Sequence, residues 1–281
     1  MKKGLVLEGG AMRGMFTAGA MDVMMEKGVK FDGAIGVSAG AAFGVNYKSG
    51  QIGRVIRYNT KFCNDKRYCG LRSLLKSGDI YNTDFCYRVV PTQYDPFDFD
   101  SYGKTPMEFY VVSTNVETGK PVYHPYGGWE DHGFDWIRAS ASMPLVSHMV
   151  EIDGVKMLDG GISDPIPLQY FETLGYNRNV LILTQPKGYR KKKSSAMLLI
   201  KLMYRKYPHL VAAMAQRHEV YNATMDYIDE QEADGKIFVL RPDSPLPVSR
   251  VEKSPDKLRV AYEIGRKAAA AKMAALDDFL S

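Results

Sequence analysis

The chain has 281 residues, of which 45% are hydrophobic and 25% charged, and its formal net charge is +5. This composition is that of an ordinary globular protein, and a modest charge spread along the chain argues against nucleic acid as a partner. Three cysteines without a Cys-x-x-Cys pair predict free thiols in a reducing compartment, which we take to be the cytoplasm.

The first fifty residues use one unit twice, a short buried strand that passes through a tight turn into a helix. Residues 4–8 are an apolar run ending at glycines, and residues 12–26 have the spacing of a packed helix closed by Gly28. Residues 31–37 predict a second strand, and residues 41–47 resume helical spacing. Two such units indicate an α/β sheet with parallel strands and a right-handed crossover.

The remaining chain predicts a cover, further strands and a closing helix. Residues 49–101 are irregular and are expected to cover one end of the sheet. From Ser254, with Pro255 at the first helical position, one long helix is expected to reach Leu280. Strand patterns, with a hairpin turn at Asp153-Gly154, occur at residues 108–114, 121–124, 149–153, 155–158, 180–184 and 236–240.

No internal repeat or linker divides the sequence. We therefore expect a single domain over residues 1–281, with the motifs in about residues 4–185 and a helical cover plus one strand in residues 186–281. No stretch approaches the roughly 18 apolar residues of a membrane span, so any membrane contact is expected to be peripheral.

The pattern Gly-x-Ser-x-Gly, from Gly36 to Gly40, lies between a predicted strand and a predicted helix. A sharp strand-to-helix turn strains its central residue and presents the hydroxyl outward, and glycine neighbours let the chain pass closely. The following helix directs its N-terminal amides to the same point. Ser38 is therefore the candidate nucleophile, while a plain Gly- and Ser-rich turn is the alternative interpretation of the pentapeptide alone.

A glycine-rich turn precedes the first helix and comprises Gly9, Gly10, Ala11, Met12, Arg13 and Gly14. A dinucleotide fingerprint requires glycine in place of Met12, and a phosphate loop requires Lys and Ser or Thr directly after Gly14, so neither fits. Its backbone amides suit an oxyanion hole instead, in which each donor contributes about 3 kcal/mol. Arg13 either orients this loop or forms an ordinary salt bridge.

A serine nucleophile usually has a histidine base, but none of the five histidines stands in a recognisable catalytic setting. His218, in a polar helical stretch with Gln216, Arg217 and Glu219, is expected at the surface. His209 is also expected there, whereas three histidines stay open as bases: His124, His132 and His148.

Asp159 is a different candidate base. It ends a predicted strand, and the glycines that follow, Gly160 and Gly161, bend the backbone so that the acid faces a cleft, although Asp-Gly-Gly alone is usually a plain turn. A free aspartate is poorly matched to serine, so burial must raise its pKa. Asp164 competes for this role, but its place before Pro165 favours a helix cap.

These three motifs, in this order, resemble the patatin-like phospholipases. The segment RASASMP, from Arg138 to Pro144, also looks like the family segment that precedes its hairpin, and the resemblance spans about residues 4–185. It implies a three-layer α/β/α fold with a mostly parallel central sheet. It also implies hydrolysis of carboxylic esters, commonly in phospholipids or neutral lipids, by a Ser-Asp dyad without histidine.

On this resemblance Ser38 is the nucleophile, Asp159 the base and residues 9–14 the oxyanion hole, and no metal or organic cofactor is required. Ala11 stands where the family has its third consecutive glycine, and a positive φ there would cost about 1 kcal/mol. Two alternatives stay open: a lipid-binding or regulatory module that does not hydrolyse its ligand, and a Ser-His-Asp esterase.

A basic run, KGYRKKK, extends from Lys187 to Lys193 and precedes an apolar, basic-flanked stretch at residues 197–207. It fits peripheral contact with an anionic membrane, where each surface Lys or Arg contributes about 1 kcal/mol. A solvated loop that leads into a packed helix is the simpler interpretation. The sequence gives no indication of the oligomeric state.

Overall fold

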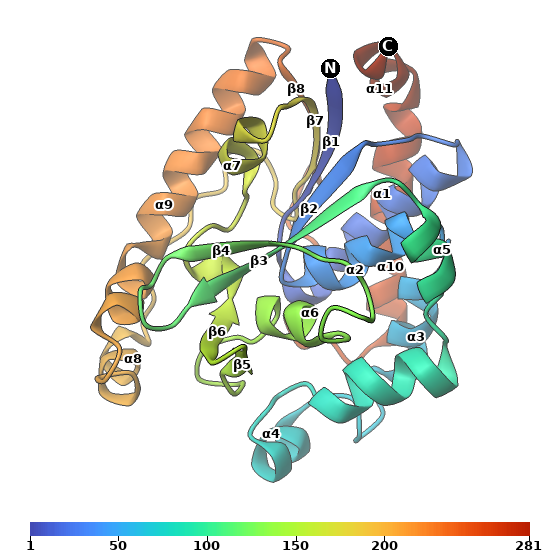
Figure 1. The fold of residues 1–281 in the computed structure, drawn as a ribbon. Coiled ribbons are helices and arrows are strands. Elements are labelled where there is room, and N and C mark those ends of the chain that lie inside the picture. Colours follow the sequence, from blue (N-terminus) through green and yellow to red (C-terminus); the bar gives the residue numbers. More distant parts are fainter.

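The computed structural model describes residues 1–281 and centres on one eight-stranded sheet (Figure 1). Its strand order is β5-β6-β3-β2-β1-β7-β8, with β4 also paired to β3. The strands β3, β2, β1, β7 and β8 are parallel, whereas β4, β5 and β6 pair in antiparallel fashion. Their bounds are β1 (Lys2–Leu7), β2 (Gly33–Val37), β3 (Glu108–Asn115), β4 (Pro121–Pro125), β5 (Val150–Ile152), β6 (Val155–Asp159), β7 (Tyr176–Ile182) and β8 (Ile237–Leu240).

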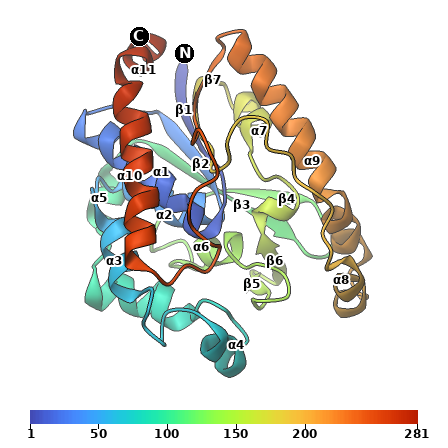
Figure 2. The same cartoon turned by 180° about the vertical axis from the view of Figure 1, so that it is seen from behind.

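Helices cover both faces of this sheet and produce a three-layer α/β/α architecture (Figures 1 and 2). Side chains alternate between the faces, so Leu5 and Leu7 enter one hydrophobic core while Val6 enters the other. The first core includes α1 (Gly14–Glu26), α2 (Ala39–Lys48), α3 (Arg54–Phe62), α6 (Asp135–Ser140), α10 (Pro255–Ala271) and α11 (Met273–Leu280). The second core includes α7 (Leu168–Thr173) and α9 (Pro208–Ala233).

Two helices of the first layer, α1 and α10, cross with their backbones in contact. A Cβ atom on Gly265 of α10 would lie 2.0 Å from the carbonyl oxygen of Phe16, and one on Gly19 of α1 would lie 2.0 Å from that of Tyr262. Glycine at both positions is therefore what permits this approach. The crossing fastens a late segment of the chain to the helix that follows β1.

Most predicted elements are confirmed, and the differences have local causes. The first helix opens with a 3₁₀ turn, η1 (Ala11–Arg13), before α1 begins at Gly14. The prediction of a single closing helix is wrong, because the helix is interrupted at Lys272, between α10 and α11. The Lys272 amide bonds there to the carbonyls of Ala269 and Ala270, and its ammonium group donates to the Val239 carbonyl of β8 at 3.3 Å.

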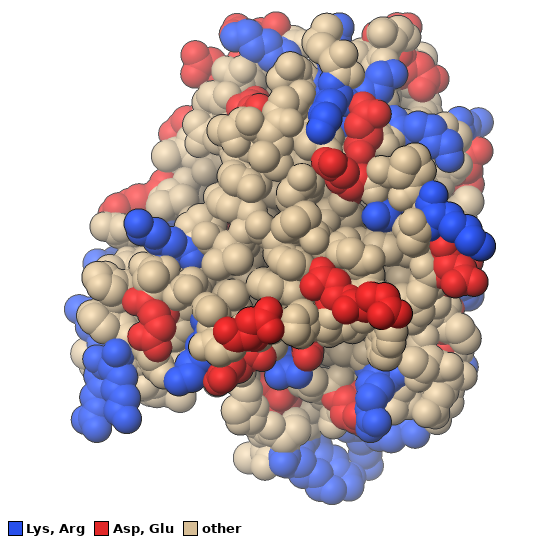
Figure 3. Space-filling model, viewed as in Figure 1, with Lys and Arg blue, Asp and Glu red and all other residues tan.

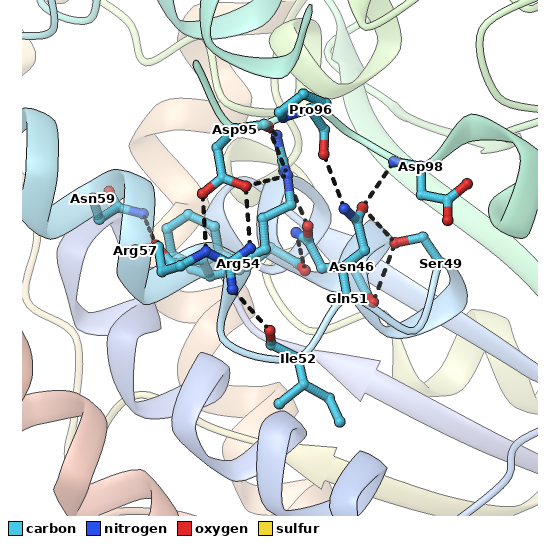
Figure 4. Close-up of polar contacts among 12 residues, drawn as sticks. Asn46, Ser49, Gln51, Ile52, Arg54, Arg57, Asn59, Asp95, Pro96 and Asp98 are labelled. Carbon is cyan, nitrogen blue, oxygen red and sulfur yellow. Dashed lines mark hydrogen bonds and ion pairs between the residues drawn. The ribbon is translucent and has the colours of Figure 1, made fainter. Parts of the chain in front are cut away.

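The predicted cover comprises α3, α4 (Leu71–Ser77), a π-helical segment η2 (Phe85–Tyr94) and α5 (Phe99–Lys104). Buried Arg54 fastens it, as Figure 4 shows: its guanidinium donates to the Asp95 carbonyl from Nε at 3.1 Å and from Nη2 at 2.6 Å. Its Nη1 donates to Asn46 Oδ1 at 3.0 Å, while Arg57 bonds the Asp95 carboxylate. These bonds tie the end of η2 to α2 and α3.

No helix in the structure is both long enough and apolar enough to cross a bilayer.

Candidate active site

Ser38 lies in the sharp turn between β2 and α2 and adopts a left-handed backbone conformation, with φ 55° and ψ −120°. Ser38 is buried. Few non-glycine residues hold such a φ without a structural or functional reason. A Cβ atom on Gly40 would lie 2.3 Å from the carbonyl oxygen of Leu7, so glycine lets α2 start directly against the end of β1. Gly36, within β2, packs in turn against the Gly40 backbone.

Asp159 ends β6, where it pairs with Ser113 of β3 and is buried. Gly160 and Gly161 open the 3₁₀ turn η3 (Gly160–Ile162) that follows, and the Gly161 amide donates to Asp159 Oδ1 at 2.8 Å. Burial raises the pKa of the Asp159 carboxyl, while the positive charge of Arg217 and the nearby Ser38 hydroxyl lower it. The predicted nucleophile and the predicted base are thus brought together.

Asp164 is not a helix cap, so that interpretation is wrong. Helix α7 begins only at Leu168, with Pro167 in the cap position. The Asp164 carboxylate instead accepts a hydrogen bond from the hydroxyl of Tyr123 on β4 at 2.7 Å. The antiparallel strand β4 places this tyrosine within reach, which local sequence around residue 164 does not reveal.

The glycine-rich loop connects β1 to α1 and runs beside Ser38. The amides of Gly10, Ala11 and Met12 donate to no protein acceptor, so they are free to bind an oxygen atom at this position. Ala11 has a φ of 49°, the left-handed conformation anticipated for a residue that replaces glycine.

Buried Glu8 holds the start of this loop. Its carboxylate accepts hydrogen bonds from the Thr184 amide at 2.6 Å and from the Tyr221 hydroxyl at 2.9 Å. The Thr184 hydroxyl also donates to the carbonyl of Gly9 at 3.2 Å. Loop, central sheet and α9 are thereby fixed relative to one another.

Two cavities meet at Ser38. The first, of about 110 Å³, is apolar: 16 of its 19 lining residues are hydrophobic, and many come from α2 and the cover segment. The second, of about 330 Å³, is a polar cleft that holds Asp159 and the glycine-rich loop. Ala11, Ser38 and Met143 line both, so the candidate nucleophile stands between the two cavities.

The polar cleft is rich in positive charge. Arg13, Lys191, Arg217 and Arg250 line it, and none of them has a carboxylate within ion-pair distance. The Lys191 ammonium lies 4.2 Å from the centre of the Tyr221 ring. Burial, followed by the nearby charge of Arg217, lowers the pKa of Lys191 to about 7.

Sequence reasoning missed Arg217, which was noted only as a polar neighbour of His218. Its guanidinium Nε donates to the carbonyl of Gly161, directly beside the candidate base. The available signal was its spacing along α9: Arg217 stands three residues after Met214 and four before Tyr221, and both of those side chains are buried.

Ser140 was also missed as an individual site residue. The backbone amide of Ser38 donates to its Oγ at 2.8 Å, and that hydroxyl donates to the Val112 carbonyl at 2.6 Å. Its segment was noticed only through the family resemblance, because a small polar residue at a helix end has no pattern of its own.

None of the five histidines lines either cavity. His124 stacks on Trp136 with ring centres 3.8 Å apart, and His148 bonds Asp79 near α4. His209 is exposed, as expected. The structure contains no group of three or more His, Cys, Asp or Glu side chains arranged to hold a metal ion.

Comparison with known proteins gives matches over most of the chain. Residues 207–281 match a domain of unknown function (DUF6363). YjjU, an uncharacterised protein of Escherichia coli strain K12, is 27% identical over 272 residues, which cover 93% of this chain and 74% of YjjU. The lysophospholipase nte1 of Emericella nidulans is 28% identical over 185 residues, 61% of this chain but only 11% of that much longer protein.

Among solved structures, VipD from Legionella pneumophila matches with a TM-score of 0.48 and 13% identity, over 99% of this chain and 67% of VipD. The family model for patatin-like phospholipases matches residues 5–172, which hold the glycine-rich loop, Ser38 and Asp159. Because this match covers more than half of the sequence, the chain belongs to the patatin-like phospholipase family.

Proposed function

We propose that this protein is a serine acyl hydrolase that cleaves carboxylic ester bonds of lipids with Ser38 and Asp159. The observation that carries the proposal is the junction of the two cavities. There the Ser38 hydroxyl and a buried carboxyl meet beside three backbone amides that have no protein acceptor.

The chemistry follows from this arrangement. Asp159 takes the proton of the Ser38 hydroxyl as its oxygen attacks the ester carbonyl, and burial makes the carboxylate a stronger base than a solvated one. The amides of Gly10, Ala11 and Met12 stabilise the resulting oxyanion. The alcohol leaves with the proton, and water then attacks the acyl-serine, assisted by the same carboxylate.

The two cavities suit two parts of a lipid. The apolar cavity has the lining of an acyl-chain site, whereas the cleft offers unpaired cations to an anionic group on the alcohol side of the ester. Lysophospholipases among the relatives support a substrate with one acyl chain and a charged head group. The free cysteines, Cys63, Cys69 and Cys86, support a reducing, cytoplasmic setting.

Membrane contact through residues 187–193 stays a proposal, in a narrower form. Lys187 pairs with Glu232 at 3.5 Å, Arg190 pairs with Asp226, and Lys191 turns into the cleft. Of the basic run, Lys192 and Lys193 are left exposed and unpaired. The proposal of a single domain over residues 1–281 is supported by the shared sheet, in which β8 joins β7 and β7 joins β1.

Covalent labelling tests the proposal most directly. A fluorophosphonate should modify Ser38 in the unsubstituted protein, and Ser38→Ala should abolish both labelling and hydrolysis of lysophospholipids and p-nitrophenyl esters. A non-catalytic lipid-binding module would bind these lipids without turnover. A Ser-His-Asp esterase would lose activity in one of the five His→Ala variants, whereas a Ser-Asp dyad retains it in all five.

A further inference from the structure

Two short helices leave large apolar side chains in solvent. Helix α4 exposes Leu71 and Leu75, at 73% and 86% of their surface, and α8 (Met197–Met203) exposes Leu198 and Leu202, at 84% and 67%. Each pair stands at i and i+4, on one side of its helix. Most other exposed apolar side chains are less accessible, so these two ridges are the largest unexplained apolar features of the surface.

Helix α8 has a buried inner face opposite its leucine ridge. Met197 and Ile200 are buried against α9 and the sheet, in a third and smaller hydrophobic core that also holds Leu158 and Leu210. An inner anchor of this kind holds the outer leucines rigidly outward. In α4, Ser73 is the buried residue, and its hydroxyl donates to the Asp79 carbonyl at 2.7 Å.

Both helices flank the mouth of the polar cleft. Residues 143–146 line that cleft, and this segment is bonded to each helix region in turn. The Leu145 amide donates to the hydroxyl of Tyr204, just after α8, at 3.0 Å. The Ile80 amide, just after α4, donates to the Val146 carbonyl at 2.8 Å. In Figures 1 and 2, α4 and α8 both lie at the end of the molecule opposite the two chain termini.

The two chain segments that carry the ridges have charge of one sign. No Asp or Glu occurs in residues 66–78 or in residues 187–218. Exposed cations accompany the leucines on both helices, and Figure 3 shows Lys and Arg gathered over α8 and over α4. They are Arg72 and Lys76 on α4, and Lys192, Lys193, Lys201, Arg205 and Lys206 around α8.

We propose that α4 and α8 together form a docking surface for an anionic lipid bilayer, with the leucine ridges inserted among the head groups and the cations against the lipid phosphates. Apolar insertion combined with basic residues is the pattern of peripheral membrane binding. Docking by both helices sets the cleft mouth on the membrane, so a lipid reaches Ser38 without crossing water. The inference rests on the proposed function for its purpose, but binding itself requires no turnover.

The test is vesicle flotation of the Ser38→Ala protein, which leaves the lipid intact. Vesicles contain phosphatidylcholine alone or with phosphatidylglycerol. The α4 variant carries Leu71→Ser and Leu75→Ser, and the α8 variant carries Leu198→Ser and Leu202→Ser. A charge variant carries Lys76→Gln and Lys201→Gln. Matched controls are Ile52→Ser, in the turn at the far end of α2 from Ser38, and Lys267→Gln on α10.

We expect each leucine pair to weaken partitioning into anionic vesicles by about tenfold. The charge variant should show a weaker preference for phosphatidylglycerol than the parent, and both controls should bind like the parent. Binding that is unchanged in the α4 or the α8 variant would overturn the two-helix surface. So would a parent that sediments as a dimer and becomes monomeric in these variants, because the ridges would then cover a second copy of the chain.

A soluble short-chain ester separates this result from the proposed function. Every docking variant, made in the protein with Ser38 intact, should fold with the melting temperature of the parent. If that protein hydrolyses no ester while the flotation pattern holds, the proposed function fails and the docking surface stands.

Discussion

The backbone amide of Ser38 donates its hydrogen bond to the side-chain oxygen of Ser140, at 2.8 Å. A strained turn residue is thereby held by a side chain 102 positions later in the chain. Since the Ser140 hydroxyl donates its own hydrogen bond to the Val112 carbonyl of β3, the two serines and the sheet form one continuous chain of hydrogen bonds. Ser140 is a positioning residue, because it acts on the nucleophile only through the backbone.

The isosteric pair Ser140→Thr and Ser140→Val tests that role. Both add the same volume, but only threonine keeps the hydroxyl. We expect the valine variant to lose about 1–3 kcal/mol more stability, since a buried amide and a buried carbonyl lose their partner. Fluorophosphonate labelling of Ser38 should be slower in the Ser140→Val variant and return to the parent rate in the Ser140→Thr variant. In Ser140→Val, kcat should change more than KM. Equal labelling rates in the two variants would assign Ser140 to packing alone.

Asp159→Asn should lower the activity and raise the stability of the protein. Loss of the base is expected to lower kcat by about 10²–10⁴-fold. The pKa of Asp159 is raised in the folded state, so its favourable contribution is complete below its unfolded pKa and is lost as pH rises through the folded value. Asparagine still accepts from Gly161 without the buried charge. Its melting temperature should therefore exceed that of the parent at pH 7, and the difference should vanish near pH 4.

The lowered pKa of Lys191 predicts that KM depends on pH for anionic substrates only. Its pKa is lowered to about 7, so the cleft loses one positive charge as pH rises through that value. KM for an anionic lysophospholipid should rise above pH 7, whereas KM for an uncharged monoacylglycerol should stay flat. Lys191→Met should remove this pH dependence of KM. Lys192→Gln, at an exposed neighbouring position, is the control that should keep it.

Gly40→Ala should destabilise the turn around Ser38 relative to the parent protein. The added Cβ would meet the Leu7 carbonyl oxygen at 2.3 Å, and the nearest atoms are all backbone atoms, which cannot easily move aside. We expect a loss of about 1–3 kcal/mol in urea denaturation. Gly103→Ala, in α5, meets nothing within 4 Å and should instead gain about 0.5–1 kcal/mol. A stable Gly40→Ala protein with normal labelling of Ser38 would contradict the required close approach.

The sequence predicts those parts of the fold and site that have a local cause. Ser38 and Asp159 stand at strand ends followed by glycines, and such turns leave a recognisable pattern within five residues. No such turn pattern surrounds Lys191 or Arg217. The path of a loop places Lys191 in the cleft, and the packing of α9 places Arg217 there. The break at Lys272 likewise depends on contact with β8, far away in the sequence.

The crossing of α10 over α1 bears on when the protein becomes active during its synthesis. Helix α1 follows directly from the glycine-rich loop, and its outer face is covered only when residues 255–271 have been made. A growing polypeptide that still lacks them leaves Phe16 and its neighbours unpacked, so we expect the amides before α1 to be poorly fixed. Lipid cleavage would then begin only after residues 255–271 have left the ribosome and packed on α1, which protects nearby membranes from immature copies.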